Sequence, residues 1–180
     1  MNSDAFVYHR VVENMRGNIL YPLNQLKDIF PEEYAKHVLK YKNREHLLKT
    51  QIPILNCLWN DVLHFTAVHP SVLYENLKSV GYNTDELVWK RCYEIPITYL
   101  NPESTITCLY NRDMGLIPEA RDFHKFDPNK MEEYKKVPEE TIEYYREKFK
   151  KNERPLFFHR VPHILFRGTL DIKGIKVINM

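Results

Sequence analysis

Glycine is scarce in this sequence, with five residues among 180. The chain contains neither GxxxxGK(S/T) nor GxGxxG, the glycine-rich patterns that hold phosphates in P-loop and dinucleotide-binding folds. This scarcity argues against both folds. Aromatic residues are abundant instead, with 12 tyrosines, 9 phenylalanines and 2 tryptophans.

Cysteine is also sparse, and no CxxC pair exists. Cys57, Cys92 and Cys108 are odd in number and widely spaced, which favours reduced, buried thiols over a disulfide framework. The N-terminus lacks a basic region followed by an apolar core, and no apolar run reaches the roughly 20 residues of a membrane span. These absences predict a cytoplasmic protein with no membrane association.

The charge is nearly balanced, with 26 basic and 24 acidic residues and a net charge of +2. Such a small excess does not indicate nucleic acid or an anionic membrane as the partner. A length of 180 residues with 43% hydrophobic content suits one substantial core. We therefore predict a single domain over residues 1–180.

The apolar stretch from Ile52 to Pro70 is the part of the chain around which the other elements are arranged. Residues 62–66 have the β-branched and apolar character of a buried strand, and Pro70 suits the start of a helix that Gly81 ends. Asn60 and Asp61 precede the strand. They either hydrogen-bond the backbone of a turn or face a cleft.

The segment Phe6–Val12 alternates large side chains and predicts a strand. His9 lies on the face of Val7 and Val11, so it is either a satisfied core residue or, if the strand borders a pocket, a ligand-binding residue. Helices are expected over 23–30, from Pro31 to about residue 41, and after a cap at Asn43. Their charges, including His37 and Lys40, form either a solvated face or a surface for an acidic partner.

The second half of the chain predicts further strands and one clear helix. The helix begins after Pro138, and Ile142, Tyr145 and Phe149 form its apolar inner stripe. In the helix from Pro70, the predicted apolar face consists of Val72, Leu73, Leu77 and Val80. An extended loop is expected over 114–130, including an exposed His124. Strands are expected over residues 87–93, 105–110, 156–159, 163–167 and 175–178. The predicted fold class is α+β, with a mixed or antiparallel split sheet flanked by helices.

Simple catalytic and metal motifs are weak or missing. Asp61, His64 and His69 are the metal donors worth naming, but no HExxH or paired CxxC spacing accompanies them, so we predict no metal site. Cys57 lies within ILNCLW, where an inert core thiol is the simpler interpretation than a nucleophile. Asp61, Glu75 and Asp171 could be proposed for nuclease chemistry, but no spacing supports them.

Three segments carry a resemblance to a known family. They are YHR at residues 8–10, GNILYPL at 17–23 and HFTAVHPSVLYENLKS at 64–79. Together they resemble the opening half of small ADP-ribosyltransferase-like proteins, such as the bacterial enzymes that modify rifampicin or DNA and the RNA 2′-phosphotransferases. The resemblance implies an ADP-ribosyltransferase-like fold, NAD as the cofactor and transfer of ADP-ribose as the activity.

The resemblance also implies roles for individual residues. His9 would hold the nicotinamide ribose, Phe65 and Thr66 would fall in the second motif, and Tyr74 would stack on the nicotinamide. His163 stands where the family has a late-strand carboxylate. This departure bears on ADP-ribose transfer, because the family uses that carboxylate in the transfer step. Arg10, Arg160 and Arg167 could instead hold phosphate, as basic residues do in the 2′-phosphotransferases. Asn60 and Asp61 would line the rim.

Two hypotheses follow from these observations. In the first, the protein is an ADP-ribosyltransferase-like transferase with His9, His163 and Asp61 as candidate catalytic residues. Its NAD-binding residues are then His9, Arg10, Asn60, Thr66 and Tyr74. In the second, it is a non-enzymatic binding or regulatory module for a protein or nucleic-acid partner, supported by the missing carboxylate and by the basic residues between Lys148 and Arg167.

Overall fold

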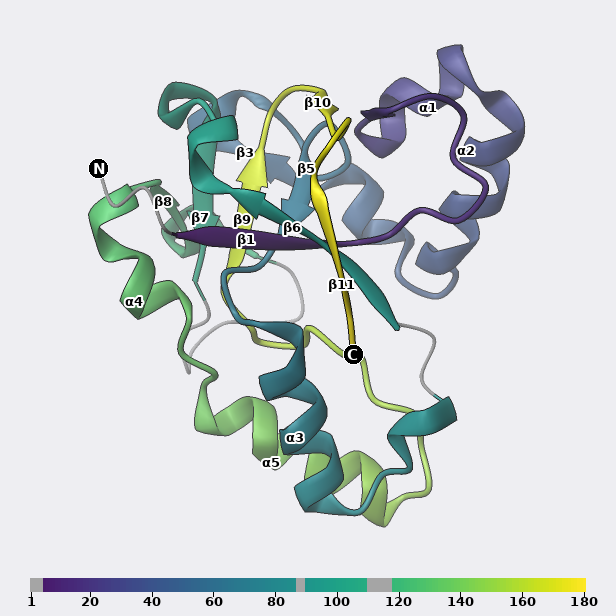
Figure 1. Ribbon diagram of the computed structural model, residues 1–180, viewed down its shortest axis with the longest axis vertical. Coiled ribbons are helices and arrows are strands. Elements are labelled where there is room, and N and C mark those ends of the chain that lie inside the picture. Colours follow the sequence, from purple (N-terminus) through teal and green to yellow (C-terminus); the bar gives the residue numbers. More distant parts are fainter. Residues whose placement is uncertain (1–4, 87–89, 110–117) are drawn as a thin grey trace.

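The computed structural model describes residues 5–86, 90–109 and 118–180, and this part of the chain has α+β architecture (Figure 1). Two antiparallel sheets form its centre. The α-helices are α1 (Leu23–Ile29), α2 (Pro31–Val38), α3 (Pro70–Val80), α4 (Met131–Tyr134) and α5 (Glu139–Lys150). Short 3-10 turns join many of the elements.

The first sheet has the strand order β1-β6-β11, and the second has the order β5-β9-β7-β8. The strands of the first sheet are β1 (Phe6–Arg10), β6 (Arg91–Pro96) and β11 (Lys176–Asn179). Those of the second are β5 (Leu63–Phe65), β7 (Thr105–Cys108), β8 (Phe123–Lys125) and β9 (His163–Phe166). Two small ribbons pair β2 (Ile19–Leu20) with β10 (Leu170–Asp171) and β3 (Gln51–Ile52) with β4 (Cys57–Leu58).

The two sheets meet at Tyr8 and Thr66. The Tyr8 N–H donates to the Thr66 carbonyl at 2.8 Å, and the Thr66 N–H donates to the Tyr8 carbonyl at 3.2 Å. This bridge fixes the middle of β1 beside the end of β5. The predicted α+β class with antiparallel sheets is therefore confirmed.

Both faces of the second sheet are covered by core residues, as the alternation of side chains along β9 shows. Ile164 and Phe166 belong to the core shared with the first sheet, whereas Leu165 faces a second core that contains Trp59 and Tyr41. A third, smaller core holds Val68, Leu73 and Val161, near the paired helices α3 and α5. Helices α1 and α2 lie at the opposite end of the molecule (Figure 1).

Local signals placed α3 and α5 well. Helix α3 begins at Pro70 and is followed by Gly81, which has a φ of 114° that a glycine adopts without strain. Its buried face differs from the prediction, because Tyr74 is buried while Val72 is 39% exposed. In α5, Tyr145 of the predicted inner stripe is fully buried and its hydroxyl donates to the Phe157 carbonyl, whereas Phe149 of that stripe is 43% exposed.

Other predicted elements were wrong or displaced. The third helix is a 3-10 turn at Glu45–Lys49, and residues 157–160 form a turn where a strand was expected over 156–159. Part of the expected loop at 114–130 is strand β8, whose exposed His124 lies opposite Thr107. Strand β6 begins at Arg91 and continues to Pro96; residues 87–89, 110 and 114–117 of the predicted elements lie outside the described residues.

Within the described ranges, no helix has both the length and the apolar character needed to cross a membrane. Cys57, Cys92 and Cys108 are buried and free, as predicted. Burial raises the pKa of each thiol, to about 12 for Cys92 and Cys108, so these thiols stay protonated at neutral pH.

Candidate functional site

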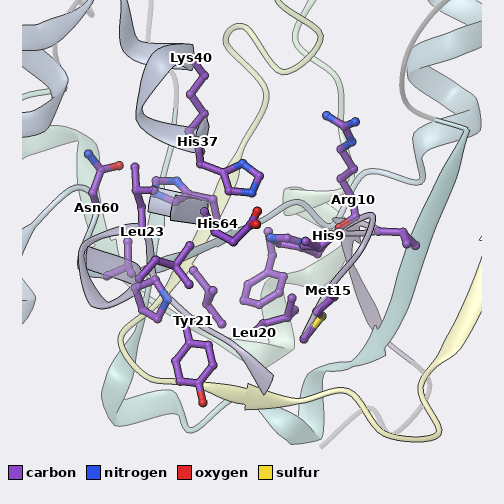
Figure 2. Close-up of a pocket in the computed structure, with 18 of the residues that line it drawn as sticks. His9, Arg10, Met15, Leu20, Tyr21, Leu23, His37, Lys40, Asn60 and His64 are labelled. Atoms are coloured by element: carbon purple, nitrogen blue, oxygen red, sulfur yellow. Dashed lines mark hydrogen bonds between the residues drawn. The ribbon is translucent and has the colours of Figure 1, made fainter. Parts of the chain in front are cut away.

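A pocket of about 720 Å³ lies where β1, β5 and helices α1 and α2 come together (Figure 2). Its volume falls in the range of roughly 300–1,000 Å³ that is usual for small-molecule sites. The apolar part of its wall includes Leu20, Leu23, Leu26, Phe65 and Phe158. The polar part contains histidines and cations from four separate segments of the chain.

His9 lies on β1 and lines the pocket, with its ring edge-on to Phe65 at a centroid distance of 5.6 Å. Its Nδ1 lies 2.7 Å from the Arg10 carbonyl oxygen, which only accepts, so Nδ1 carries the proton. Burial lowers the pKa of His9 to about 4, against the opposing effect of that hydrogen bond. His9 is therefore neutral at pH 7, and its Nε2 is an acceptor.

His64 and His163 form a second polar group of the wall, which we call the imidazole pair. Because His64 pairs with Leu165 in the β5-β9 register, His163 lies diagonally across on the same face. The two rings are 6.4 Å apart and nearly perpendicular. The Trp59 ring lies against both, at 4.7 Å from His64 and 6.1 Å from His163.

Each ring of the imidazole pair has one nitrogen bonded to the backbone. His64 Nε2 donates to the Trp59 carbonyl at 2.8 Å, and His163 Nδ1 donates to the Val161 carbonyl at 2.6 Å. Burial lowers the pKa of both residues, to about 3 for His64, whose positive form is also disfavoured by His163 and Lys40. Both rings are therefore neutral at pH 7, and the second nitrogen of each is an acceptor.

Helix α2 and the turn after it contribute a set of charged residues to the pocket. Glu33, Lys36, His37 and Lys40 all line it, at the i, i+3, i+4 and i+7 positions of one helix face. We call them the α2 charged stripe. No residue of α2 is buried, so this face is not held against a core. Figure 2 shows His37 and Lys40 on one side of the pocket and Arg10 on the other.

The rim carries a positive potential that is visible in the pKa of Lys40. Loss of hydration at the pocket wall, together with the charges of Arg44 and Arg10, lowers this pKa. The pKa of His37 is lowered by burial and then by Lys40. Glu33 offsets part of this charge through its ion pair with Lys36, at 2.9 Å. Anionic groups are the ligands that such a rim attracts.

Asn60 lies in the pocket wall and is 1% exposed. Its Oδ1 accepts a hydrogen bond of 2.6 Å from the Tyr41 hydroxyl, whose pKa burial raises to about 12. Its Nδ2 is enclosed and has no hydrogen-bond partner among residues 5–86, 90–109 and 118–180. A buried donor without a partner is unusual in stable cores and is a feature of functional sites.

The structure brings together only part of the predicted site. Arg10, Asn60, Thr66 and His163 line the same pocket as His9. Thr66 is also held locally, because its hydroxyl accepts the Val68 N–H at 3.1 Å. Asn60 is buried in the wall, whereas the sequence placed it at the rim.

Tyr74 and Asp61 are not among the residues that line the pocket, contrary to the predicted roles. Tyr74 is on the buried face of α3 and packs on Phe157 with a centroid distance of 5.0 Å. The Asp61 carboxylate accepts hydrogen bonds from Asn24 Nδ2 and from the Leu58 N–H, both at 2.7 Å. Asp61 therefore hydrogen-bonds the backbone of the turn before β5, which is one of the two alternatives that the sequence left open.

Three other residues considered for chemistry, His69, Asp171 and Arg167, have local structural contacts. His69 caps α3 by accepting the Ser71 N–H, and the Asp171 carboxylate accepts the Lys173 N–H. Arg167 donates to the Leu55 carbonyl at 2.6 Å, away from the pocket. Within the described part of the chain, no group of three His, Cys, Asp or Glu residues could hold a metal ion.

The α2 charged stripe is the main feature that the sequence interpretation missed. From the sequence, the charges of this segment, including His37 and Lys40, were assigned to a solvated face or to a surface for an acidic partner. A signal was present, because a helix with charges at i, i+3, i+4 and i+7 and few apolar partners needs a polar neighbour for that face. The sequence alone did not show that this neighbour is the wall formed by β1 and β5.

Comparisons with protein-family models, with curated proteins and with solved structures found no match to this chain. No relative therefore assigns a ligand to the pocket. We therefore infer function from the residues of the pocket.

Proposed function

We propose that the pocket binds NAD or a related nucleotide, as an ADP-ribosyltransferase-like protein would. One observation carries this proposal: a neutral His9 and the cations Arg10 and Lys40 converge on one cavity large enough for a small molecule. The resemblance assigns the ribose of NAD to His9. The antiparallel split sheet agrees with the fold that the resemblance implies, and the pocket lies where its two parts meet.

The phosphates of the nucleotide are proposed to lie at the rim. Arg10 and Lys40 approach it from opposite sides, and His37 lies beside Lys40 (Figure 2). Guanidinium and ammonium groups are the common partners of phosphate oxygens. This arrangement replaces the glycine-rich loops that the sequence lacks, because side chains rather than backbone N–H groups would neutralise the phosphates.

The base and the nicotinamide are proposed to contact the apolar wall. Leu20, Leu23 and Phe65 lie there, on β2, α1 and β5. Phe158 supplies a further aromatic surface from the segment before β9. Phe158 takes the stacking role that the resemblance assigned to Tyr74. The Tyr74 ring packs on Phe157 instead.

Transfer of ADP-ribose is the second level of the proposal. The family uses a late-strand carboxylate, and His163 occupies that position here. Among the residues that line the pocket, the carboxylates are Glu13 and Glu33, and Glu33 belongs to the α2 charged stripe. Glu33 is therefore the residue whose substitution by Gln should remove transfer, measured as nicotinamide release from NAD, while leaving NAD binding in place.

A binding module without transfer is the alternative function, and one observation favours it. The neutral His163 cannot supply the negative charge of the missing carboxylate. In this version the protein would hold its nucleotide, or a protein or nucleic-acid partner, without chemistry. If the partner is a nucleic acid, affinity should fall steeply with added salt.

Calorimetric titration with NAD tests the proposal. The wild-type protein should bind NAD saturably, and His9→Phe should weaken binding by about tenfold or more, because a buried hydrogen bond to the ligand is lost. His124→Phe is the matched control, since His124 is exposed on β8 and does not line the pocket. A folded wild-type protein that does not bind NAD would contradict the proposed ligand.

A further inference from the structure

The imidazole pair offers acceptors and no donors to the pocket. One nitrogen of His64 and one of His163 are bonded to backbone carbonyls. The second nitrogen of each has no hydrogen-bond partner among the described residues, and neither is an enclosed, unsatisfied atom of the kind seen at Asn60. Both residues line the pocket, so these nitrogens are available to a ligand there. Two neutral acceptors cannot bond to each other, so only a ligand or solvent with donor groups satisfies them.

Four kinds of group could meet such a pair: a metal ion that the nitrogens coordinate, or a ligand ammonium, neutral N–H or hydroxyl group that donates a hydrogen bond. The described residues hold no three-ligand set for a metal. An ammonium group is disfavoured by the positive surroundings, because Lys40 acts on both His9 and His64, and Arg10 acts on His9. Hydroxyl and neutral N–H groups donate without bringing positive charge. The electrostatics of the pocket thus favour uncharged donors at this position, and sugar hydroxyls are the donors that a phosphorylated ligand commonly carries.

The rim of the pocket favours anionic groups, because cations lie there. His37 and Lys40 are exposed there and Arg10 faces them across the pocket, whereas His64 and His163 are partly buried. A ligand that satisfies both parts is anionic at one end and carries hydroxyls at the other.

We propose that His64 and His163 form a hydroxyl-recognition subsite, and that the pocket takes a phosphorylated sugar whose free hydroxyls point to this pair while its phosphate lies at Arg10, His37 and Lys40. This inference rests on the proposed nucleotide function and deepens it, since it fixes the orientation of the sugar. It also makes sugar hydroxyls, rather than the base, the group that the pocket discriminates.

The test compares D-ribose 5-phosphate with 2-deoxy-D-ribose 5-phosphate, which lacks one hydroxyl, by calorimetric titration. The wild-type protein should bind the ribose compound about tenfold more tightly, because the missing donor leaves a pocket acceptor unpaired. In His64→Phe and His163→Phe the ratio should fall towards one, since the ring is kept and the acceptor is lost. His124→Phe should keep the wild-type ratio.

Equal affinity of the two sugars for the wild-type protein would overturn the subsite, and so would absence of binding by both. This comparison needs no variant, so it decides the matter even if a phenylalanine variant fails to fold. An unchanged ratio in both folded variants would also overturn it. NAD is titrated in parallel: sugar discrimination without NAD binding removes the proposed nucleotide alone, whereas NAD binding without discrimination removes the subsite alone.

Discussion

At the scale of single residues, the pocket is defined by histidines that are kept neutral. His9, His64 and His163 each donate one ring N–H to a backbone carbonyl, at 2.6–2.8 Å. The hydrogen bond fixes the tautomer, and burial removes the charge. The result is three acceptor nitrogens beside a positive rim. No single sequence motif predicts this combination.

These lowered pKa values predict a specific loss of stability in acid. The folded-state pKa is about 4 for His9 and about 3 for His64, against 6.5 for the unfolded chain. Below pH 6.5 the unfolded state binds protons that the folded state does not, so the free energy of unfolding falls down to about pH 4. The slope is about 1.4 kcal/mol per pH unit for each such histidine.

Urea unfolding at pH 7 and pH 5 measures this effect. Because carboxylates also titrate in acid, the useful quantity is the difference between wild type and His64→Phe. The variant should lose about 2 kcal/mol less than wild type between the two pH values. Equal losses would mean that His64 is not held neutral in the folded protein.

At the scale of elements, helices α3 and α5 are fastened by a close contact at Gly81. A Cβ placed there would lie 2.6 Å from Phe149 Cζ, and φ is 114°. Gly81→Ala should therefore destabilise the protein by about 1–3 kcal/mol, measured by urea unfolding. Gly174→Ala is the control, because φ is also positive but no atom lies within 4 Å. If Gly81→Ala and Gly174→Ala lowered the free energy of unfolding equally, the Phe149 contact would not contribute. In a Phe149→Leu background, the difference between the two substitutions should become smaller.

The α2 charged stripe is the element on which ligand affinity should depend most. Lys40→Ala should weaken NAD binding about tenfold and reduce its salt dependence, because one charged contact to phosphate is removed. Lys42→Ala provides the comparison, since Lys42 is exposed two residues away and does not line the pocket. Calorimetry at two salt concentrations gives both quantities. Equal effects of the two substitutions would argue that the stripe does not contact the ligand.

Elements with local boundary signals could be predicted from the sequence. Pro70 and Gly81 bound α3, and Pro138 precedes α5, because proline and glycine act through their own backbone geometry. Strand β8 was missed because it is three residues long with two exposed side chains, and it is formed by pairing with β7. Its pattern carries no trace of that partner.

At the scale of the whole molecule, the pocket is a product of long-range contacts. The bridge between Tyr8 and Thr66 brings β1 to β5, and thereby His9 to the neighbourhood of His64, across more than 50 residues of sequence. His9, Arg10, Asn60, Thr66 and His163 were named from the sequence, and these five residues line the pocket. The sequence could not show which face of α3 is buried, so Tyr74 was misplaced, and it could not join α2 to β1.

The central claim is that neutral histidines at this junction contact a nucleotide, and two-dimensional ¹H–¹⁵N NMR of the imidazole nitrogens tests it most directly. At pH 7 we expect neutral rings that are protonated on Nδ1 in His9 and His163 and on Nε2 in His64. Addition of NAD should shift the unprotonated nitrogens of all three saturably and leave His124 unchanged. Charged rings at pH 7, or three signals that do not respond to saturating NAD, would contradict the account.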